Sequence, residues 1–490
     1  MSGTRPRDWS RFAPSRKMQI MFHRALRHAL VLALFGLPAA ANAQAFGLNE
    51  IGSCALARGF AVTGAPCDDA STIYWNPGAV QKKTGLSLLA GAAVIKLDGD
   101  FTADSTYRVH ETEIPTTIVP HVFLTYLMLN RRVALGLGIY VPYGLTSQWK
   151  DDFPGRFSAK KASLQTIYVQ PNVAFQITDN WSFGGGPVIG HSTVELIRAA
   201  DLSSFPVPST AVPPGTTFGN FGIPRRTEFV RASLKGSAMA YGFNLGIHGK
   251  LTPDIQVGIR GLSQLSFSYD DADATFTQTP TGLVFAAGNP LNLPGGTPVD
   301  AIVATQFAAG GPLTAQKVKT QIRHPSQLQV GLGYTGIDNT TLSIDYAYTG
   351  WKAFNQLPVS FQGPAAASAS TVLVEDYKNT SSLRLGAEQS MTNGSAVRLG
   401  FTAATSAAPP ETVTPLLPEM NRQLAMIGGF LPITTSLGLD ATYSHIFTPG
   451  SRGRIDERAP TADARAALAL NSGAYTLSAN ILSLSLKYAF

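Results

Sequence analysis

Two adjacent carboxylates and two cysteines near the amino terminus are the residues whose types and spacing could do chemistry. Asp68 and Asp69 directly follow Cys67, and Cys54 lies a short distance upstream. Paired carboxylates can act as general acid and base, and cysteines can act as nucleophiles or metal ligands. The 8 histidines are scattered, none stands at ligand spacing from the cysteines, and no nucleophile motif accompanies them. We therefore expect no enzyme, no cofactor and no metal site.

The chain starts with a stretch that has the three parts of a secretory signal peptide. The basic residues Arg24 and Arg27 precede an apolar core at 29–37, and small residues follow as far as Ala43. The apolar core is too short to span a bilayer as a helix. We expect residues 1–43 to be an export signal with an extended amino-terminal region.

Two details of this leader stay open. One A-x-A pattern ends at Ala43 and another ends at Ala45, so the cleavage site is defined only to within two residues. The start codon is either Met1 or Met21, because the residues before Met21 take no part in the signal pattern.

In an exported protein, the cysteine pair predicts a disulfide. Cys54 and Cys67 are the only cysteines of the chain. The loop that they close is worth roughly 3 kcal/mol in the chain-entropy model. Two free thiols are the alternative.

The composition indicates a protein that meets an apolar solvent. Only 14% of the 490 residues are charged, against about 25% in a typical soluble domain. After the leader there is no run of about 20 apolar residues that could form a membrane helix. The net charge of +7 comes partly from the leader, and no basic patch with interleaved aromatic residues accompanies it. We therefore expect a membrane β-barrel and no nucleic-acid partner.

Apolar and polar residues alternate from residue 85 onward, which is typical of β-strands. The segment YGFNLGIHG, starting at Tyr241, places four large apolar side chains on one face and small or polar ones on the other. The carboxyl-terminal segment ILSLSLKYAF alternates in the same way and ends on Phe490. A final strand ending on an aromatic residue suits closure of an outer-membrane barrel and binding of the barrel assembly machinery.

Short and long connectors alternate along the chain. Tight turns are expected at 130–132, 178–180, 252–254, 336–339, 392–394 and 432–434. Long connectors are expected near 98–115, 143–160, 198–228, 271–316, 352–379, 406–421 and 449–472. This rhythm matches short periplasmic turns and long extracellular loops, and it predicts an all-β, antiparallel transmembrane barrel of about fourteen strands.

The segment between the leader and the first strand predicts a plug. It is too long for a simple arm and too short for an independent domain, and a barrel of this size has room for a compact insert. We therefore divide the chain into the signal region 1–43, an amino-terminal hatch at 44–84 and a barrel at 85–490.

The hatch sequence FGLNEIGSCALARGFAVTGAPCDDASTIYWNPG resembles the start of the FadL family of outer-membrane transporters for long-chain fatty acids and other hydrophobic molecules. Weaker similarity is found in LGIYVPYGL, in GRF, in WSFGGG and in HPSQLQVGLGY, so the resemblance covers the whole mature chain. The hatch and gate residues that it implies are Phe46, Asn49, Glu50, Arg58, Asp68, Asp69, Asn76, Pro77 and Gly78. The family usually has Ala at the position of Gly78, and the change suggests a looser turn. The cysteine pair is not general in the family.

The resemblance implies a capture groove between two long extracellular loops. The apolar candidates for ligand contact on these loops are Phe205, Phe218, Phe221, Leu283, Phe285 and Leu293. Ordinary packing within the loops is the alternative for each of them.

The resemblance also implies sideways release of ligand through a gap beside a kinked third strand. Pro142 provides a physical cause for the kink, because proline lacks the donor that a strand ladder needs. Gly144 weakens regular pairing further. The alternative is that Pro142 merely ends the strand.

Three further positions concern the ligand itself. Arg198 matches a family position implicated in carboxylate binding, and an ordinary solvated charge at the base of a loop is its alternative reading. We expect transport of hydrophobic small molecules, with long-chain fatty acids as the substrate. Val141 replaces a family hydroxyl, and a family lysine is missing near Leu373, which makes neutral aromatic or aliphatic hydrocarbons the alternative. Phe46 matches a hatch aromatic that approaches the ligand pocket.

The polar strand faces should line the lumen and hold the hatch. The charged candidates are Arg260, Asp345, Arg384, Glu388, Arg398 and Asp440. We expect a monomer in the outer membrane of a Gram-negative bacterium, in contact with its lipid and lipopolysaccharide. An outer-membrane enzyme and a general porin are the other classes considered; a hatch argues against an open porin, and a large energised receptor needs about 22 strands.

Overall fold

The computed structural model describes residues 45–79, 85–128, 132–201, 203, 207, 212–364, 370–453 and 472–490. The expected signal region, the last residues assigned to the hatch and the candidate ligand contact Phe205 lie outside the described residues.

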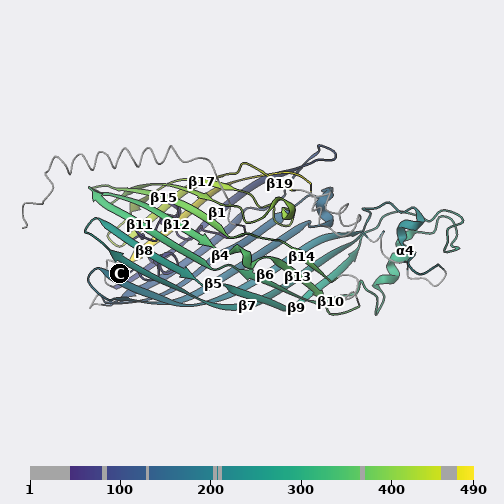
Figure 1. The fold of residues 1–490 in the computed structure, drawn as a ribbon, viewed down its shortest axis with the longest axis horizontal. Coiled ribbons are helices and arrows are strands. Elements are labelled where there is room, and N and C mark those ends of the chain that lie inside the picture. Colours follow the sequence, from purple (N-terminus) through teal and green to yellow (C-terminus); the bar gives the residue numbers. More distant parts are fainter. Residues whose placement is uncertain are drawn as a thin grey trace, which may run out of the picture. The chain divides into compact units, whose positions relative to one another are not determined.

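The described chain forms a closed antiparallel barrel with fourteen strand positions in its wall (Figure 1). The barrel closes because the first and last wall strands pair along their length, from Ser87 opposite Ala489 to Ala103 opposite Gly473. The wall consists of β1 (Gly85–Ala103), β3 (Thr117–Leu127), β4 (Val133–Gln148), β5 (Lys161–Gln176), β6 (Trp181–Asp201), β7 (Glu228–Lys250), β8 (Ile255–Leu262) with β9 (Leu265–Gln278), β10 (Gln316–His324) with β11 (Gln327–Ile337), β12 (Thr340–Thr349) with β13 (Gln356–Phe361), β14 (Thr371–Val374) with β15 (Thr380–Ser390), β16 (Ala396–Ala404), β17 (Arg422–Pro432), β18 (Leu437–Phe447) and β20 (Gly473–Ala489). The short strands β2 (Val109–Glu111) and β19 (Ser451–Gly453) extend β1 and β20.

Four neighbouring wall positions are each built from two strands separated by a break. The hydrogen-bond ladder is interrupted there, and the connector expected near 352–379 is wrong in part, because it contains the strands β13 and β14. One break follows β10 at Pro325, which has no amide hydrogen to donate. Another follows β12, where the 3₁₀ turn η5 (Trp351–Ala353) leaves the wall. These breaks supply side chains to the lumen, as described below.

The outer and inner faces of each wall strand meet different environments. On β7 the large apolar residues Tyr241, Phe243, Leu245 and Ile247 are exposed on the outside, whereas Asn244 is fully buried on the lumen side. A soluble β-sandwich would bury the apolar face, so this arrangement fits a wall that faces lipid. No helix in the described part of the chain has the length and apolar character to cross a bilayer.

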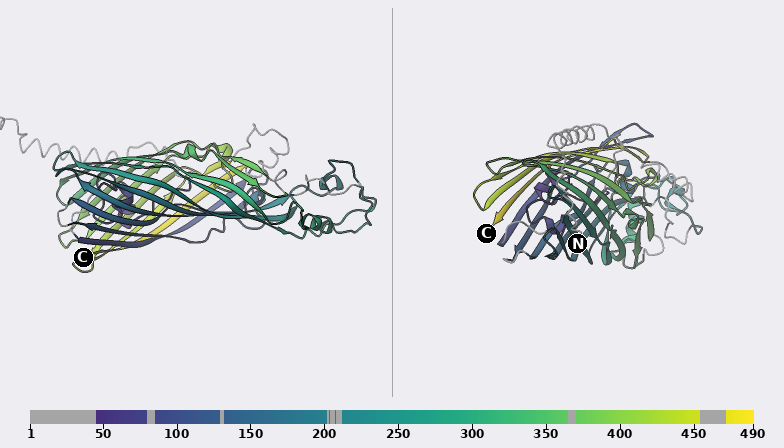
Figure 2. Two further views of the ribbon diagram at one scale, coloured as in Figure 1. Left: turned by 90° about the horizontal axis from the view of Figure 1, so that it is seen from below. Right: turned by 60° about the vertical axis from the view of Figure 1, so that its left-hand side comes forward.

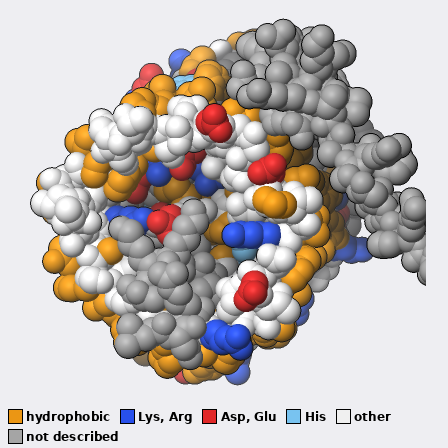
Figure 3. Space-filling view, turned by 90° about the vertical axis from the view of Figure 1, so that its left-hand side faces the viewer, with side chains coloured by type: hydrophobic (Ala, Val, Ile, Leu, Met, Phe, Trp, Pro, Cys, Tyr) orange, Lys and Arg blue, Asp and Glu red, His pale blue; other side chains and the backbone are white. Residues whose placement is uncertain are grey.

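The amino-terminal hatch lies inside the wall of strands (Figure 2). It contains two short helices, α2 (Ser53–Ala57) and α3 (Thr72–Trp75), and nearly all of its side chains are buried. In Figure 3, the barrel end near the carboxyl terminus shows Lys, Arg, Asp and Glu side chains within the mouth and hydrophobic side chains around the rim. Charged side chains therefore gather inside the mouth of the barrel at this end.

The long extracellular loops form a small core of their own at the other end of the barrel. The loops after β6 and β9 contribute η3 (Phe218–Phe221), α4 (Val299–Ala304) and η4 (Thr305–Phe307). Phe218 and Phe285 are buried within this loop core, and Phe221, Leu283 and Leu293 pack against it half-buried. Phe218 and Phe285 thus belong to ordinary loop packing instead of lining an open groove, because the two loops bury their apolar residues against each other. Two further 3₁₀ turns, η2 (Pro154–Phe157) and η6 (Pro410–Thr412), lie in other loops.

Candidate ligand-binding site

Hydrogen bonds between hatch and wall hold the hatch in place. Asp345 on β12 accepts a hydrogen bond from the Thr63 amide through Oδ2 at 2.7 Å. The Asn76 side chain donates to the Thr63 carbonyl at 2.9 Å and to the Ile247 carbonyl on β7 at 3.0 Å. One amide group therefore ties the end of the hatch both to its own loop and to the wall.

Gly78 approaches the wall closely. A Cβ atom at this position would lie 2.3 Å from the carbonyl oxygen of Gly246 on β7. The neighbouring Pro77 carbonyl accepts a hydrogen bond from Asn172 Nδ2 on β5 at 3.2 Å. The missing Cβ of Gly78 lets the two backbones approach each other closely here.

Two wall arginines contact aromatic side chains of the hatch, and one arginine of the hatch contacts the wall. The Arg260 guanidinium lies 4.1 Å from the centre of the Tyr74 ring, and it donates to Asn244 Oδ1 at 3.0 Å. Arg384 lies 5.6 Å from the Trp75 ring. Cations over aromatic faces are attracted by the ring quadrupole, more strongly where water is excluded. Arg58, which the hatch itself provides, donates to a serine of β12 at 3.2 Å.

A polar cavity of about 970 Å³ lies between the hatch and the barrel end seen in Figure 3. Arg398 in its wall bridges two carboxylates: Nε lies 2.6 Å from Glu388 Oε2, and Nη1 contacts Asp440. The Arg398 side chain is only 8% exposed, so this pairing of charges is largely shielded from solvent.

Asp68 and Asp69 have different environments and do not form a catalytic pair. Asp69 is buried and accepts hydrogen bonds from the Ser71 amide at 2.8 Å and from its hydroxyl at 2.5 Å, which fixes the turn before α3. Asp68 is partly exposed and faces Lys487 of β20 at 3.6 Å. Both carboxylates therefore position the hatch, one internally and one against the wall.

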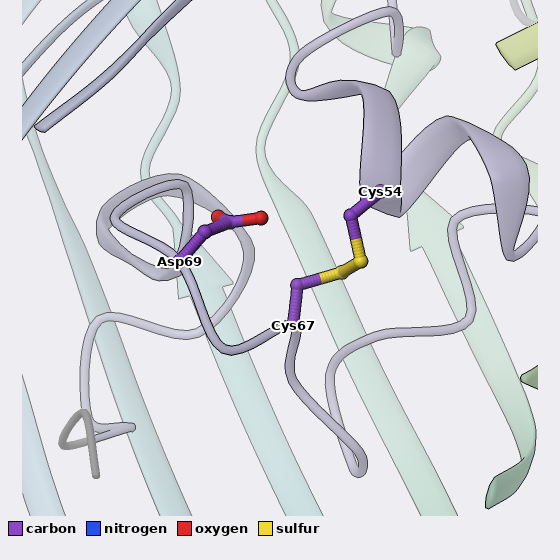
Figure 4. Close-up of side chains that lie close together, drawn as sticks. All are labelled: Cys54, Cys67 and Asp69. Atoms are coloured by element: carbon purple, nitrogen blue, oxygen red, sulfur yellow. A yellow bond between two sulfur atoms is a disulfide. The ribbon is translucent and has the colours of Figure 1, made fainter. Parts of the chain in front are cut away.

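Cys54 and Cys67 form a disulfide that joins α2 to the loop preceding these aspartates (Figure 4). Asp69 lies near the two sulfur atoms, and the three residues are spaced as metal ligands could be. Because the sulfur atoms are bonded to each other, the pair closes a covalent loop within the hatch and leaves no thiolates to bind a metal.

The third wall strand, β4, contains a bulge at Pro142. Its register against β5 shifts between Tyr140 and Tyr143, so that two residues of β4 oppose one of β5. Its pairing with β3 ends at Tyr140 opposite His121. Pro142 therefore does not end the strand, which continues to Gln148, and the edge beyond the bulge is free of β3.

The beginning of the hatch occupies this free edge. The Leu48 amide donates to the Pro142 carbonyl at 2.9 Å, and the Gly144 amide donates to the Phe46 carbonyl at 2.9 Å. A Cβ at Gly144 would lie 2.8 Å from a methyl carbon of Leu48, so glycine allows this approach. Residues 46–48 thus act as a short added strand where β3 would otherwise pair.

The Phe46 ring is enclosed by aromatic side chains. Tyr143, His324, Trp351 and Phe354 surround it at ring-centre distances of 6.0, 5.7, 4.6 and 5.2 Å. Most of these contacts are edge-to-face, which is the preferred geometry of aromatic pairs. Trp351 and Phe354 come from the break between β12 and β13, so the interrupted wall builds this aromatic cage.

An apolar pocket adjoins the cage. It has a volume of about 60 Å³, and Phe46 forms part of its lining together with Leu164, Leu196, Ile322, Phe354 and Leu417. The charged residue in the lining, Glu195, is paired with Lys161 at 2.7 Å.

Two further ligand candidates, Val141 and Arg198, lie on β4 and β6. Val141 packs half-buried against the same apolar core. Arg198 is on β6, opposite Ala232, further toward the loops than the pocket-lining Leu196. Asn49 and Glu50 follow Phe46, and Glu50 Oε2 accepts the Asn49 amide at 2.9 Å.

Sequence reasoning missed the cage residues His324, Trp351 and Phe354. His324 follows an alternating strand and directly precedes Pro325, and the two other residues lie in a segment assigned to a loop. Aromatic residues crowded beside a predicted strand end were the available signal, but nothing local indicated that they meet Phe46.

The barrel, its hatch and its apolar pocket can be compared with known proteins. A model of the family described as outer membrane protein transport protein (OMPP1/FadL/TodX) matches residues 36–490. The chain belongs to this family. It is therefore an outer-membrane transport protein of a Gram-negative bacterium, and the FadL/TodX family to which it belongs consists of transporters of hydrophobic compounds.

The proteins related in sequence match most of the length of this FadL-family chain. Outer membrane protein P1 of Haemophilus influenzae is 25% identical over 492 residues, which cover 95% of this chain and 98% of that protein. The long-chain fatty acid transport protein of Escherichia coli is 25% identical over 433 residues, which cover 86% of this chain and 91% of that protein.

Solved structures show the same barrel fold. A FadL homologue of Pseudomonas aeruginosa superposes with a TM-score of 0.70 at 19% identity, covering 91% of this chain and all of that chain. The toluene transporter TbuX of Ralstonia pickettii gives a TM-score of 0.60 at 18% identity, covering 91% of this chain and 99% of that chain.

Proposed function

We propose that this protein carries small hydrophobic molecules into the cell envelope by way of the apolar pocket and the opening beside β4. The observation that carries the proposal is the Phe46 ring, which sits in an aromatic cage next to an apolar pocket. A ligand that displaces this ring gains a site already lined for an apolar group. Burial there is worth about 25 cal/mol per Å² of apolar surface.

The path that we propose for release runs sideways. Beyond Tyr140 the wall has no β3–β4 ladder, and residues 46–48 cover the free edge of β4 from inside. Movement of Phe46 therefore couples emptying of the cage to exposure of this edge. The polar cavity on the other side of the hatch is a poor path for an apolar molecule, because its lining is rich in charged groups.

Neutral aromatic molecules fit this site best. The group that the cage holds is a phenyl ring, and the one acid among the pocket-lining residues is more suited to a neutral ligand than to a carboxylate. The toluene transporter TbuX shares the fold. Long-chain fatty acids are the second candidate, supported by Arg198 at the loop side of the pocket and by the relative named as a long-chain fatty acid transport protein.

Ligand binding to the purified protein tests the proposal. We expect toluene to change the fluorescence of Trp351, and we expect Phe46→Ala to bind toluene more tightly, because the competing ring is gone. Phe60→Ala is the matched control, since Phe60 is equally buried but stacks on Trp75 within the hatch.

Uptake by cells that lack their own transporter separates the candidates. Faster uptake of toluene than of oleate supports the aromatic class, and the reverse supports fatty acids. Free passage of small hydrophilic sugars would show an open channel and contradict the proposal of a plugged transporter.

A further inference from the structure

The aromatic cage around Phe46 contains an indole N–H group without a hydrogen-bond partner. Trp351 is 1% exposed, and its Nε1 makes no hydrogen bond within the described part of the chain. Two further tryptophans that are as deeply buried, Trp75 and Trp149, donate from Nε1 to backbone carbonyl groups at 2.7 and 3.1 Å. Buried indole N–H groups are normally paired in this way. Trp351 departs from the pattern at the place where the ligand is expected.

A second side chain of the cage also has an unpaired nitrogen. His324 is fully buried, and its Nδ1 lies 3.0 Å from the Tyr168 hydroxyl. Its Nε2 has no hydrogen-bond partner among the residues that the structure describes. The Tyr168 hydroxyl can donate to Nδ1 or accept from it, so Nε2 can be either an acceptor or a donor, whereas Trp351 Nε1 can only donate. Both nitrogen atoms can therefore bind a hydroxyl group.

The Phe46 ring satisfies neither of these atoms. Its centre lies 4.6 Å from that of the Trp351 ring and 5.7 Å from that of the His324 ring, but a phenyl group has no conventional donor or acceptor. The hydroxyl of Tyr143, in the same cage, donates to a backbone carbonyl at 3.1 Å and accepts from a glutamine side chain at 2.9 Å. The shortage of partners thus concerns particular atoms of the cage and is not general to it.

Competition with Phe46 favours a ligand that carries oxygen. An aromatic hydrocarbon in place of Phe46 repeats the ring contacts that Phe46 already makes, and Phe46 has the advantage of being tethered to the site. A ligand oxygen adds a hydrogen bond to a buried donor that otherwise has none, and an unpaired buried donor is costly. Oxygen on the ligand therefore supplies an interaction that the Phe46 ring cannot.

The surroundings favour an oxygen group without charge. No lysine or arginine is among the described residues that line the adjoining pocket, and Glu195 of the lining is paired with Lys161 at 2.7 Å. A ligand carboxylate would leave water without gaining a counter-charge. The Thr320 hydroxyl, which also belongs to the lining, has no hydrogen-bond partner within the described chain. Uncharged polar groups thus continue from the cage into the pocket.

We propose that the preferred ligand of the cage is a neutral aromatic molecule with a hydroxyl group, whose ring takes the place of Phe46 and whose oxygen accepts a hydrogen bond from Trp351 Nε1. This inference rests on the proposed function, because it takes Phe46 to be the group that the ligand displaces. It narrows the substrate class from neutral aromatic molecules to hydroxylated ones. A phenol belongs to this class at pH 7, since the pKa of a phenolic hydroxyl is about 10.

Three ligands that share one methylated ring test the inference. They are toluene, p-cresol, which adds a hydroxyl group to toluene, and p-toluate, which adds a carboxylate instead. In calorimetric titration of the purified protein, we expect p-cresol to bind about tenfold more tightly than toluene. This factor corresponds to about 1.4 kcal/mol, which is the size of one hydrogen bond. Binding of p-toluate should be weaker than that of p-cresol, and the reverse order would overturn the proposal.

Trp351→Phe removes the N–H group and keeps an aromatic ring. The preference for p-cresol over toluene should fall from about tenfold to within about twofold, because the hydrogen bond is lost while the apolar contacts remain. The substitution breaks no hydrogen bond within the described chain. Trp149→Phe is the matched control, since Trp149 is equally buried but belongs to another cluster, with Phe101 and Phe153. Its preference should equal that of the wild type.

The outcomes separate this inference from the proposed function. Equal binding of toluene and p-cresol by the wild type would overturn the inference and leave the proposed function standing. A preference for p-cresol that survives in Trp351→Phe would do the same. If neither ligand binds to the wild type, the proposed function fails and the inference fails with it. Assembly of each variant is checked by its heat-dependent mobility in gels, and the comparison of ligands on the wild type needs no variant.

Discussion

Single charged residues in this protein differ greatly in what they contribute to stability, because some are shielded from water and others are exposed to it. Arg398 lies between Glu388 and Asp440 with 8% of its side chain exposed. Arg452 forms a pair with Asp104 at 2.7 Å, but the two side chains are 55% and 40% exposed. Coulomb interactions of exposed pairs are weakened by water and salt.

Arg398→Met should destabilise the protein by roughly 3–5 kcal/mol, since it leaves two carboxylates side by side without a counter-charge. Arg452→Gln should change stability by less than about 1 kcal/mol. Urea unfolding of both variants in the same detergent measures the difference. Similar losses in the two variants would show that water in the polar cavity already screens Arg398.

At the scale of elements, the hatch and the wall are stabilised by different means. The described hatch has two short helices and is held by a disulfide and by contacts with the lumen, whereas the wall is held by backbone pairing between neighbouring strands. Substitutions within the hatch should therefore loosen the hatch itself and leave the wall intact.

Cys54→Ser with Cys67→Ser should loosen the hatch without opening the barrel. The disulfide spans 13 residues, and the chain-entropy model gives roughly 3 kcal/mol for a loop of this size. We expect faster hydrogen exchange in residues 53–69 and unchanged exchange in β20. If both regions exchange as in the wild type, the disulfide contributes nothing beyond the contacts of the lumen.

The bulge in β4 is the element on which the proposed sideways release depends. Deletion of Pro142 removes one of the two residues that oppose a single residue of β5, so regular pairing can continue. We expect the barrel to assemble and uptake of hydrophobic substrate to fall to the level of cells without the protein.

Deletion of Gly310 is the control for this shortened chain, because a Cβ there would meet no atom within 4 Å. Its uptake should match that of the wild type. Wild-type uptake by the Pro142 deletion would show that substrate leaves by another path.

At the scale of the whole molecule, barrel and plug are separable. Closure between β1 and β20 involves no hatch residue. Deletion of residues 46–75 should therefore leave a barrel that migrates as a folded species before heating and conducts ions. Phe46→Ala keeps the plug and should not conduct. Failure of the deletion variant to assemble would make the hatch a structural core instead of a gate.

The sequence by itself predicted the barrel, its fourteen strand positions and a plug ahead of them. The outer and inner faces of a wall strand meet different environments. The alternation of apolar and polar residues at 241–248 therefore indicates directly that this segment is a strand of the barrel wall. The pairing of Cys54 with Cys67 also followed from their number and from the expected export signal. These features depend on neighbours in the chain or on composition.

Only the tertiary structure decided how the site is built. Phe46 meets Trp351 and Phe354, Ala45 meets Glu419, and the first residues of the hatch pair with β4. It also placed Phe218 and Phe285 inside the loop core, where sequence had suggested a ligand groove. Such contacts join residues up to 374 positions apart. They depend on which wall strand is interrupted and on which segment of the chain occupies the free strand edge. A local pattern of apolar and polar residues carries no information on either.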